Sequence, residues 1–167
     1  MDRLFFETKL AASDAGEISG VAWPFGKPDR IGDVIEKGAF KNVSLPLPML
    51  FGHDLNDPIG TWTSAVEDAD GFKVSGNLLV GQVKRADEIF ALVKSGAVRG
   101  LSVGFRSKKA APRKGGGRTI SDLELLEVSL VTIGMNPGAR VTSAKSSVLA
   151  LRLAESLNRA ASALAKG

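Results

Sequence analysis

Two long segments with the residue pattern of β-strands flank a short basic loop, and this arrangement constrains the fold more than any other feature. The first segment covers 99–106, and the second, over 119–133, is the most strand-like in the chain. The three glycines at 115–117 between them are typical of a hairpin tip, because no Lys-Ser/Thr pair of a phosphate-binding loop follows them. Strands joined by so short a connection pair antiparallel, so we expect a sheet at the centre of the fold.

The remaining segments predict a mainly β protein with helices, of the α+β class. Alternating or apolar runs predict strands over 3–10, 17–23, 45–51, 59–62, 66–70 and 71–78, the first two as a hairpin. Helical spacing of apolar residues predicts a helix over 82–95 that ends at Gly96. A second helical stripe, rich in Ala and Leu, covers 143–167. We therefore expect a domain over 1–142 and a C-terminal amphipathic tail that packs on it, pairs with another copy, or binds a scaffold.

The composition excludes several kinds of site. The chain has 167 residues, of which 44% are hydrophobic and 24% charged, as in soluble globular proteins. Cysteine is absent, which excludes disulfides and thiolate chemistry. His53 is the single histidine, so a metal site built on two or three histidines is excluded, and we expect no cofactor. The charged N-terminus and the lack of a long apolar run predict a cytoplasmic protein with no signal peptide and no membrane contact.

The net charge of +4 comes from 22 Lys and Arg against 18 Asp and Glu. Six basic residues gather near the hairpin tip: Arg106, Lys108, Lys109, Arg113, Lys114 and Arg118. The stretch has neither interleaved aromatic residues nor helical spacing, so it favours a solvated basic loop over a nucleic-acid-binding β-barrel. Binding of acidic protein partners stays open.

Ser102 occupies an unusual position in the first long strand. Side chains alternate along a strand, so Ser102 and Gly104 share one face while Leu101, Val103 and Phe105 share the apolar face. Glycine neighbours leave the serine with little steric cover. An accessible serine on a rigid strand suits a nucleophile, and it is also typical of an ordinary surface serine.

Three residues together fit the chemistry of a hydrolytic triad. Such a triad needs a hydroxyl nucleophile, an imidazole base and an acid that orients the imidazole, here Ser102, His53 and Glu127. Ser102 and Glu127 are symmetric about the hairpin loop, which predicts that they lie nearly opposite one another. Glu127 either partners His53 or faces water at the sheet surface. The competing acids are Asp29, Asp33, Asp54 and Asp57.

An ordered set of short motifs is similar to the tailed-phage prohead protease family, capsid-maturation serine proteases that resemble herpesvirus assemblins. The similarity covers roughly residues 5 to 142. The motifs are Gly38-Ala39-Phe40, Gly52-His53-Asp54, Pro58-Ile59-Gly60, Gly100-Leu101-Ser102-Val103-Gly104-Phe105, Leu126-Glu127-Val128-Ser129-Leu130-Val131, and Asn136-Pro137 with Ala139.

The resemblance implies a closed antiparallel β-barrel of the assemblin type with surrounding helices. It also implies a serine endopeptidase that cleaves scaffold segments from the major capsid protein precursor, inside the immature capsid in the host cytoplasm. His53 would be the general base, Ser102 the nucleophile and Glu127 the third member, where the herpesvirus enzymes have a histidine. We expect the oxyanion donors among the backbone N–H groups of 134–138. The alternative is a non-catalytic capsid-assembly or scaffolding module with the same barrel.

Overall fold

The computed structural model describes residues 2–7, 11–12 and 16–133, which form nine strands and one helix. The elements are, in chain order, β1 (Asp2–Glu7), β2 (Ala11–Ala12), β3 (Glu17–Pro24), β4 (Val34–Ile35), β5 (Leu47–Phe51), β6 (Pro58–Glu67), β7 (Gly71–Leu78), α1 (Lys84–Ser95), β8 (Gly100–Pro112) and β9 (Arg118–Val131).

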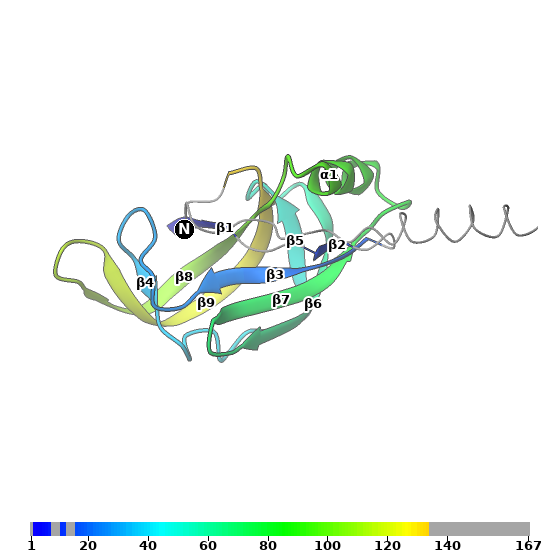
Figure 1. Ribbon diagram of the computed structural model, residues 1–167. Helices are drawn as coiled ribbons and strands as arrows, with labels where there is room; N and C mark the ends of the chain where they lie inside the picture. Colours follow the sequence, from blue (N-terminus) through cyan, green and yellow to red (C-terminus); the bar gives the residue numbers. More distant parts are fainter. Residues whose placement is uncertain (1, 8–10, 13–15, 134–167) are drawn as a thin grey trace, which may run out of the picture.

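The strands form one curled sheet in the order β1-β8-β9-β5-β6-β7-β3-β2, with β4 beside β9 (Figure 1). The prediction of a mainly β protein is confirmed. The prediction of a closed antiparallel barrel is not: among the described residues the sheet is an open half-barrel whose end strands β1 and β2 do not pair. In addition, β4 and β5 run parallel to β9. The tail expected over 143–167, and the boundary before it, lie outside the described residues.

The long hairpin expected at the centre of the fold is confirmed. β8 and β9 pair antiparallel, and the turn closes where the Arg113 N–H donates to the Gly117 carbonyl at 3.0 Å. β6 and β7 form a second antiparallel hairpin. The expected hairpin of 3–10 with 17–23 is wrong, because β1 pairs with β8 and β3 pairs with β7. Long-range pairing thus overrides sequence proximity at the N-terminal end.

The helix predicted over 82–95 is α1, which covers Lys84–Ser95 and is capped at its C-terminus by Gly96 in a left-handed conformation (φ 79°). Its buried face consists of Ala86, Ile89, Phe90 and Val93. Figure 1 shows α1 near one end of the curled sheet, away from the projecting β8–β9 hairpin. Among the described residues, no helix has the length and apolar character needed to cross a bilayer.

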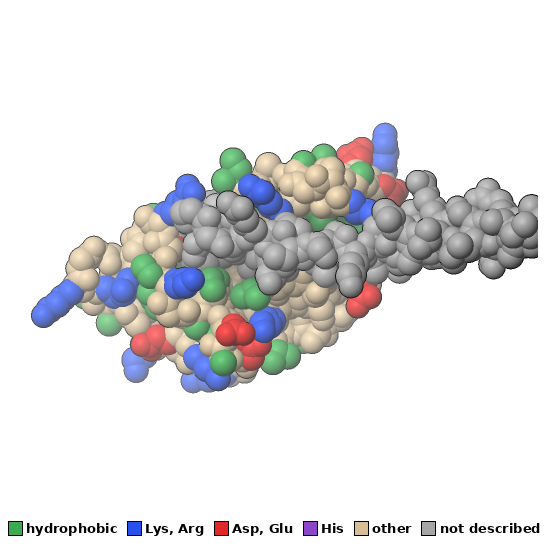
Figure 2. Space-filling view, in the orientation of Figure 1, with side chains coloured by type: hydrophobic (Ala, Val, Ile, Leu, Met, Phe, Trp, Pro, Cys, Tyr) green, Lys and Arg blue, Asp and Glu red, His purple; other side chains and the backbone are tan. Residues whose placement is uncertain are grey.

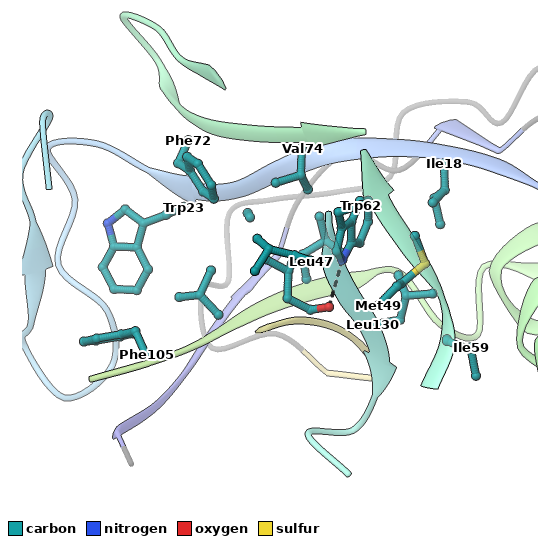
Figure 3. Packing of buried hydrophobic residues seen from close by; sticks show 14 of the residues in the cluster. Ile18, Trp23, Leu47, Met49, Ile59, Trp62, Phe72, Val74, Phe105 and Leu130 are labelled. Atoms are coloured by element: carbon teal, nitrogen blue, oxygen red, sulfur yellow. Dashed lines mark hydrogen bonds between the residues drawn. The ribbon is translucent and has the colours of Figure 1, made fainter. Parts of the chain in front are cut away.

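The apolar core fills the inside of the curled sheet (Figure 3). Phe40 is buried and stacks on Phe72 with ring centroids 4.0 Å apart. Trp62 is fully buried and its Nε1–H donates to the carbonyl of Val128 at 2.9 Å, drawn as a dashed line in Figure 3. This bond attaches the core directly to the backbone of β9 beside Glu127, so core packing also fixes the strand that carries the candidate acid.

The tip of the β8–β9 hairpin is fastened to the loop that precedes β4. The buried Asp33 carboxylate accepts the backbone N–H of Arg118 at 2.6 Å and its guanidinium Nη2 at 2.6 Å. Arg113 donates to the carbonyl of Gly32 at 2.5 Å. These contacts hold the two ends of the hairpin turn against a second segment of backbone.

The same contacts reduce the charge that the basic loop exposes. Arg113 and Arg118 contact the loop before β4, and Arg106 pairs with Glu124 at 3.1 Å. The lysines of the stretch, Lys108, Lys109 and Lys114, are exposed. Figure 2 shows Lys and Arg side chains at this end of the molecule. Two of the six residues of the predicted basic cluster, Arg113 and Arg118, therefore hold the fold together, while the pair of Arg106 with Glu124 lies at the surface.

We expect Gly117→Ala to destabilise the protein by about 3 kcal/mol and Gly115→Ala by about 1 to 2 kcal/mol. Both glycines have positive φ (75° and 94°), so both substitutions carry the same kind of backbone penalty. A Cβ on Gly117 would also lie 2.1 Å from the backbone of Gly32, whereas one on Gly115 would have nothing within 4 Å. Urea unfolding of the two variants measures the difference, and equal losses would show that the contact with Gly32 is unimportant.

Candidate active site

His53 lies in a tight turn directly after β5. β5 runs parallel to β9 as far as the pair Phe51–Leu130, and the Gly52 N–H then donates to the Leu130 carbonyl at 2.9 Å. Gly52 and His53 both have left-handed backbones, with φ of 62° and 64°. A side chain at such a φ costs about 1 to 2 kcal/mol, so the surrounding contacts must hold His53 in place. The turn directs the imidazole over the sheet between β8 and β9.

Ser102 is the third residue of β8 and lies between β1 and β9. Its side chain is on the same face as the imidazole, and its Oγ lies 2.6 Å from His53 Nε2. The expectation of an uncovered serine is wrong, since Ser102 has no exposed surface. His53 covers this face, which the sequence pattern of β8 alone does not show. The serine is thus neither an ordinary surface serine nor an open nucleophile in this conformation.

A β-bulge in β9 determines which side chains of that strand face Ser102. Phe105 pairs with Leu125, but Gly104 pairs with Glu127, so Leu126 is an extra residue on β9. A shift of one residue moves every following side chain to the other face of the sheet. With the bulge, Ser129 lies opposite Ser102, and Glu127 lies diagonally to it on the same face. Ser102 and Glu127, which were predicted to lie nearly opposite one another, are thus diagonal neighbours on one face of the sheet.

Glu127 is fully buried and makes two hydrogen bonds through different oxygens. Oε1 lies 2.5 Å from His53 Nδ1, and Oε2 accepts a hydrogen bond from Ser129 Oγ at 2.7 Å. The alternative of a water-facing glutamate is wrong. Gly104 makes room for this carboxylate, because a Cβ there would lie 2.1 Å from Glu127 Oε1. Gly104, two residues after Ser102, therefore leaves room for the Glu127 side chain.

The competing acids near His53 in the sequence have other partners. Asp54 accepts the N–H of Asn56 at 2.9 Å, in the turn that follows the histidine. Asp57 pairs with Arg85 at 3.1 Å. Each carboxylate is thus used in a local turn or an ion pair, and the structure brings neither to the imidazole.

The two acids of the loop before β4 are also engaged elsewhere. Asp33 holds Arg118, and Asp29 accepts the backbone N–H groups of Asp33 and Ile31 at 2.8 and 3.0 Å. Burial raises the pKa of the Asp29 carboxyl, against these backbone hydrogen bonds, which lower it. Both acids stabilise the fastened hairpin tip, and Glu127 is the acid that lies at the imidazole.

The three predicted site residues thus form one line of hydrogen bonds, from Ser102 Oγ through the His53 ring to Glu127 Oε1. An ionised carboxylate accepts hydrogen bonds and cannot donate them. With Glu127 ionised, the proton of the His53 ring is therefore on Nδ1. Nε2 is then the acceptor for the hydroxyl proton of Ser102. This is the geometry that activates a serine for nucleophilic attack.

Ser129 is the participant that sequence reasoning missed. Its hydroxyl touches both the backbone of His53 and the carboxylate of Glu127. The sequence does place Ser129 two residues after Glu127, and in a strand this spacing puts both side chains on one face. The stretch 134–138, where we expect oxyanion donors, lies outside the described residues. Within the described residues, no three acidic or histidine side chains are grouped as metal ligands.

Comparisons with known proteins agree on one kind of relative. A family model described as caudovirus prohead serine protease matches residues 6–152. A capsid polyprotein of Pseudomonas phage PAJU2 is 40% identical over 148 residues, which cover 84% of this chain and 22% of the polyprotein. The prohead protease of Enterobacteria phage HK97 is 34% identical over 155 residues, which cover 85% of this chain and 67% of that protein.

A solved structure with a similar fold is the bacteriophage T4 capsid assembly protease, gp21. The TM-score is 0.58 at 13% identity, and the match covers 78% of this chain and 99% of that one. At this identity the match shows a shared fold. The chain spans about a fifth of the PAJU2 polyprotein and about two thirds of the HK97 protease.

Proposed function

The chain belongs to the caudovirus prohead serine protease family, and on that premise we propose that it is a serine endopeptidase that processes the phage major capsid protein during prohead maturation. The observation that carries the proposal is the buried line of hydrogen bonds from Ser102 through His53 to Glu127. A non-catalytic assembly module would have no need to keep a serine, an imidazole and a carboxylate in this order at these distances.

In the proposed reaction, His53 Nε2 takes the hydroxyl proton as Ser102 Oγ attacks the carbonyl carbon of the scissile peptide bond. The tetrahedral intermediate collapses to an acyl-enzyme when the imidazolium gives this proton to the leaving amine. Water, deprotonated by the same nitrogen, then hydrolyses the ester and regenerates Ser102. Glu127 keeps the proton of Nδ1 in place and stabilises the imidazolium while it exists.

Burial adds a requirement to this reaction. Ser102 has no exposed surface, and the His53 and Glu127 side chains are each only 1% exposed. Charges that develop in such a site are poorly screened by water, so the carboxylate stabilises the imidazolium strongly. A peptide bond reaches Ser102 Oγ only after a rearrangement that uncovers it.

The proposed substrate is the scaffold or propeptide segment of the capsid protein precursor, and the proposed place of action is the immature capsid in the host cytoplasm. The names of the relatives, a capsid polyprotein and a prohead protease, support this substrate. The alternative is a capsid-assembly or scaffolding module with the same fold and no activity. The endopeptidase would shorten the capsid protein precursor, and the assembly module would leave it at full length.

Co-expression with the capsid protein precursor tests the proposal. We expect the wild-type chain to shorten the precursor, as measured by intact-mass spectrometry, and we expect His53→Ala to leave it at full length. Asp54→Ala is the matched control, because it changes the next residue, whose carboxylate accepts a backbone hydrogen bond in the turn. Processing that continues with His53→Ala would refute the catalytic assignment, and no processing with wild type would favour the assembly module.

A further inference from the structure

Ser129 links the backbone N–H of His53, through Glu127, to the imidazole ring of the same residue. The backbone N–H of His53 donates to Ser129 Oγ at 3.1 Å. The hydroxyl has a single proton, which it donates to Glu127 Oε2 at 2.7 Å. Glu127 Oε1 in turn accepts the ring Nδ1–H of His53 at 2.5 Å. The hydrogen bonds therefore form a closed ring that begins at the backbone of His53 and ends at its imidazole.

Each group in this ring has been removed from water. Ser129 and Glu127 are fully buried, and His53 is 4% exposed. A buried polar group without a partner is unfavourable, so every bond in the ring supports its neighbours. The ring also explains how His53 is kept at a φ of 64°, since its N–H bonds to a side chain on β9 rather than to a regular strand partner. Ser129 itself is placed by the bulge at Leu126.

We propose that Ser129 is a positioning residue of the site, which orients the Glu127 carboxylate and holds the His53 backbone so that the imidazole points at Ser102. Without the hydroxyl, Glu127 Oε2 loses its hydrogen-bond donor, and the carboxylate is free to rotate about the Cγ–Cδ bond. The N–H of His53 loses its acceptor at the same time. Both changes displace the ring nitrogens, and a displacement of about 1 Å at a catalytic group costs about 10²-fold in rate.

Only the kinetic part of this inference rests on the proposed function. The chain contains one histidine, so a protein labelled with 15N-histidine gives the ring signals of His53 and no others. In the wild type we expect a strongly hydrogen-bonded Nδ1 proton in the downfield region of the spectrum. This signal reports the His53–Glu127 bond whether or not the protein cleaves anything.

The decisive comparison is between Ser129→Thr and Ser129→Val. Threonine and valine have the same shape, and threonine keeps the hydroxyl, so their difference isolates the two hydrogen bonds from the effect of an added methyl group. We expect Ser129→Thr to keep the downfield signal and Ser129→Val to lose it. We also expect the maximal rate of Ser102 labelling by a fluorophosphonate to fall about 10²-fold in the valine variant, with the half-saturating concentration unchanged.

Ser129→Ala decides the question if the added methyl prevents folding, because alanine removes one oxygen atom and adds nothing. A wild-type spectrum and labelling rate in the valine or alanine variant would overturn the proposal. Equal defects in the threonine and valine variants would assign the effect to packing and would also overturn it. If even the wild type neither reacts with the probe nor cleaves the precursor, the proposed function fails, while the spectra still test the positioning role.

Discussion

Replacing Ser102 with alanine is expected to lower the rate of precursor cleavage on the order of 10⁶-fold. Alanine removes the oxygen that attacks the peptide bond and leaves no other nucleophile in its place. The imidazole and the carboxylate remain, but without the hydroxyl they have no atom to activate. Mass spectrometry of the precursor measures the loss, and a fluorophosphonate probe should add its mass to the wild type and not to the variant.

Ser107→Ala provides the matched control. Ser107 lies on the same strand and is half-buried, but it pairs with Leu123, away from the site. We expect it to cleave and to label as the wild type does. The double variant Ser102→Ala with His53→Ala should be no slower than Ser102→Ala alone, because residues that act as one unit are not additive. Labelling that persists in Ser102→Ala would place the nucleophile elsewhere.

The strand and the face that carry Ser102 were predictable because the information is local. A strand repeats every two residues, so the apolar positions of 101, 103 and 105 define the opposite face for 102 and 104. The hairpin was predictable for the same reason, from two strand patterns and a glycine-rich tip. The motif resemblance then pointed to His53 and Glu127 together with Ser102.

The features that complete the site depend on contacts between distant residues. The extra residue Leu126 has no signature in the strand pattern, yet it decides that Glu127 and Ser129 face Ser102. The parallel pairing of β5 with β9 brings His53 to the site, and no local pattern distinguishes it from an antiparallel pairing. The burial of Ser102 follows from these pairings, so it could not be predicted from the residues around it. Ser129 was visible as a neighbour of Glu127, but its hydrogen bond from the backbone N–H of His53 depends on the same pairings.

Replacing Glu127 with glutamine is expected to lower the cleavage rate about 10⁴-fold, while the fold is kept. Glutamine has nearly the same volume, so the buried site is filled as before. Its single oxygen accepts the Nδ1–H of His53, and its amide donates to Ser129 Oγ in place of the bond that the hydroxyl now donates. The neutral side chain does not stabilise the imidazolium, and this loss falls on the transition state. Single-turnover cleavage of the precursor measures it.

Glu124→Gln is the control for this substitution, because it makes the same chemical change on the same strand. Its carboxylate pairs with Arg106 at the surface, and an exposed pair contributes little, about 0 to 1 kcal/mol. We expect full activity in this variant. The substitutions Asp54→Asn and Asp57→Asn extend the comparison to the acids nearest the histidine in the sequence. If one of them caused the large loss and Glu127→Gln did not, a loop aspartate would orient the imidazole during the reaction, and Glu127 would only support the resting site.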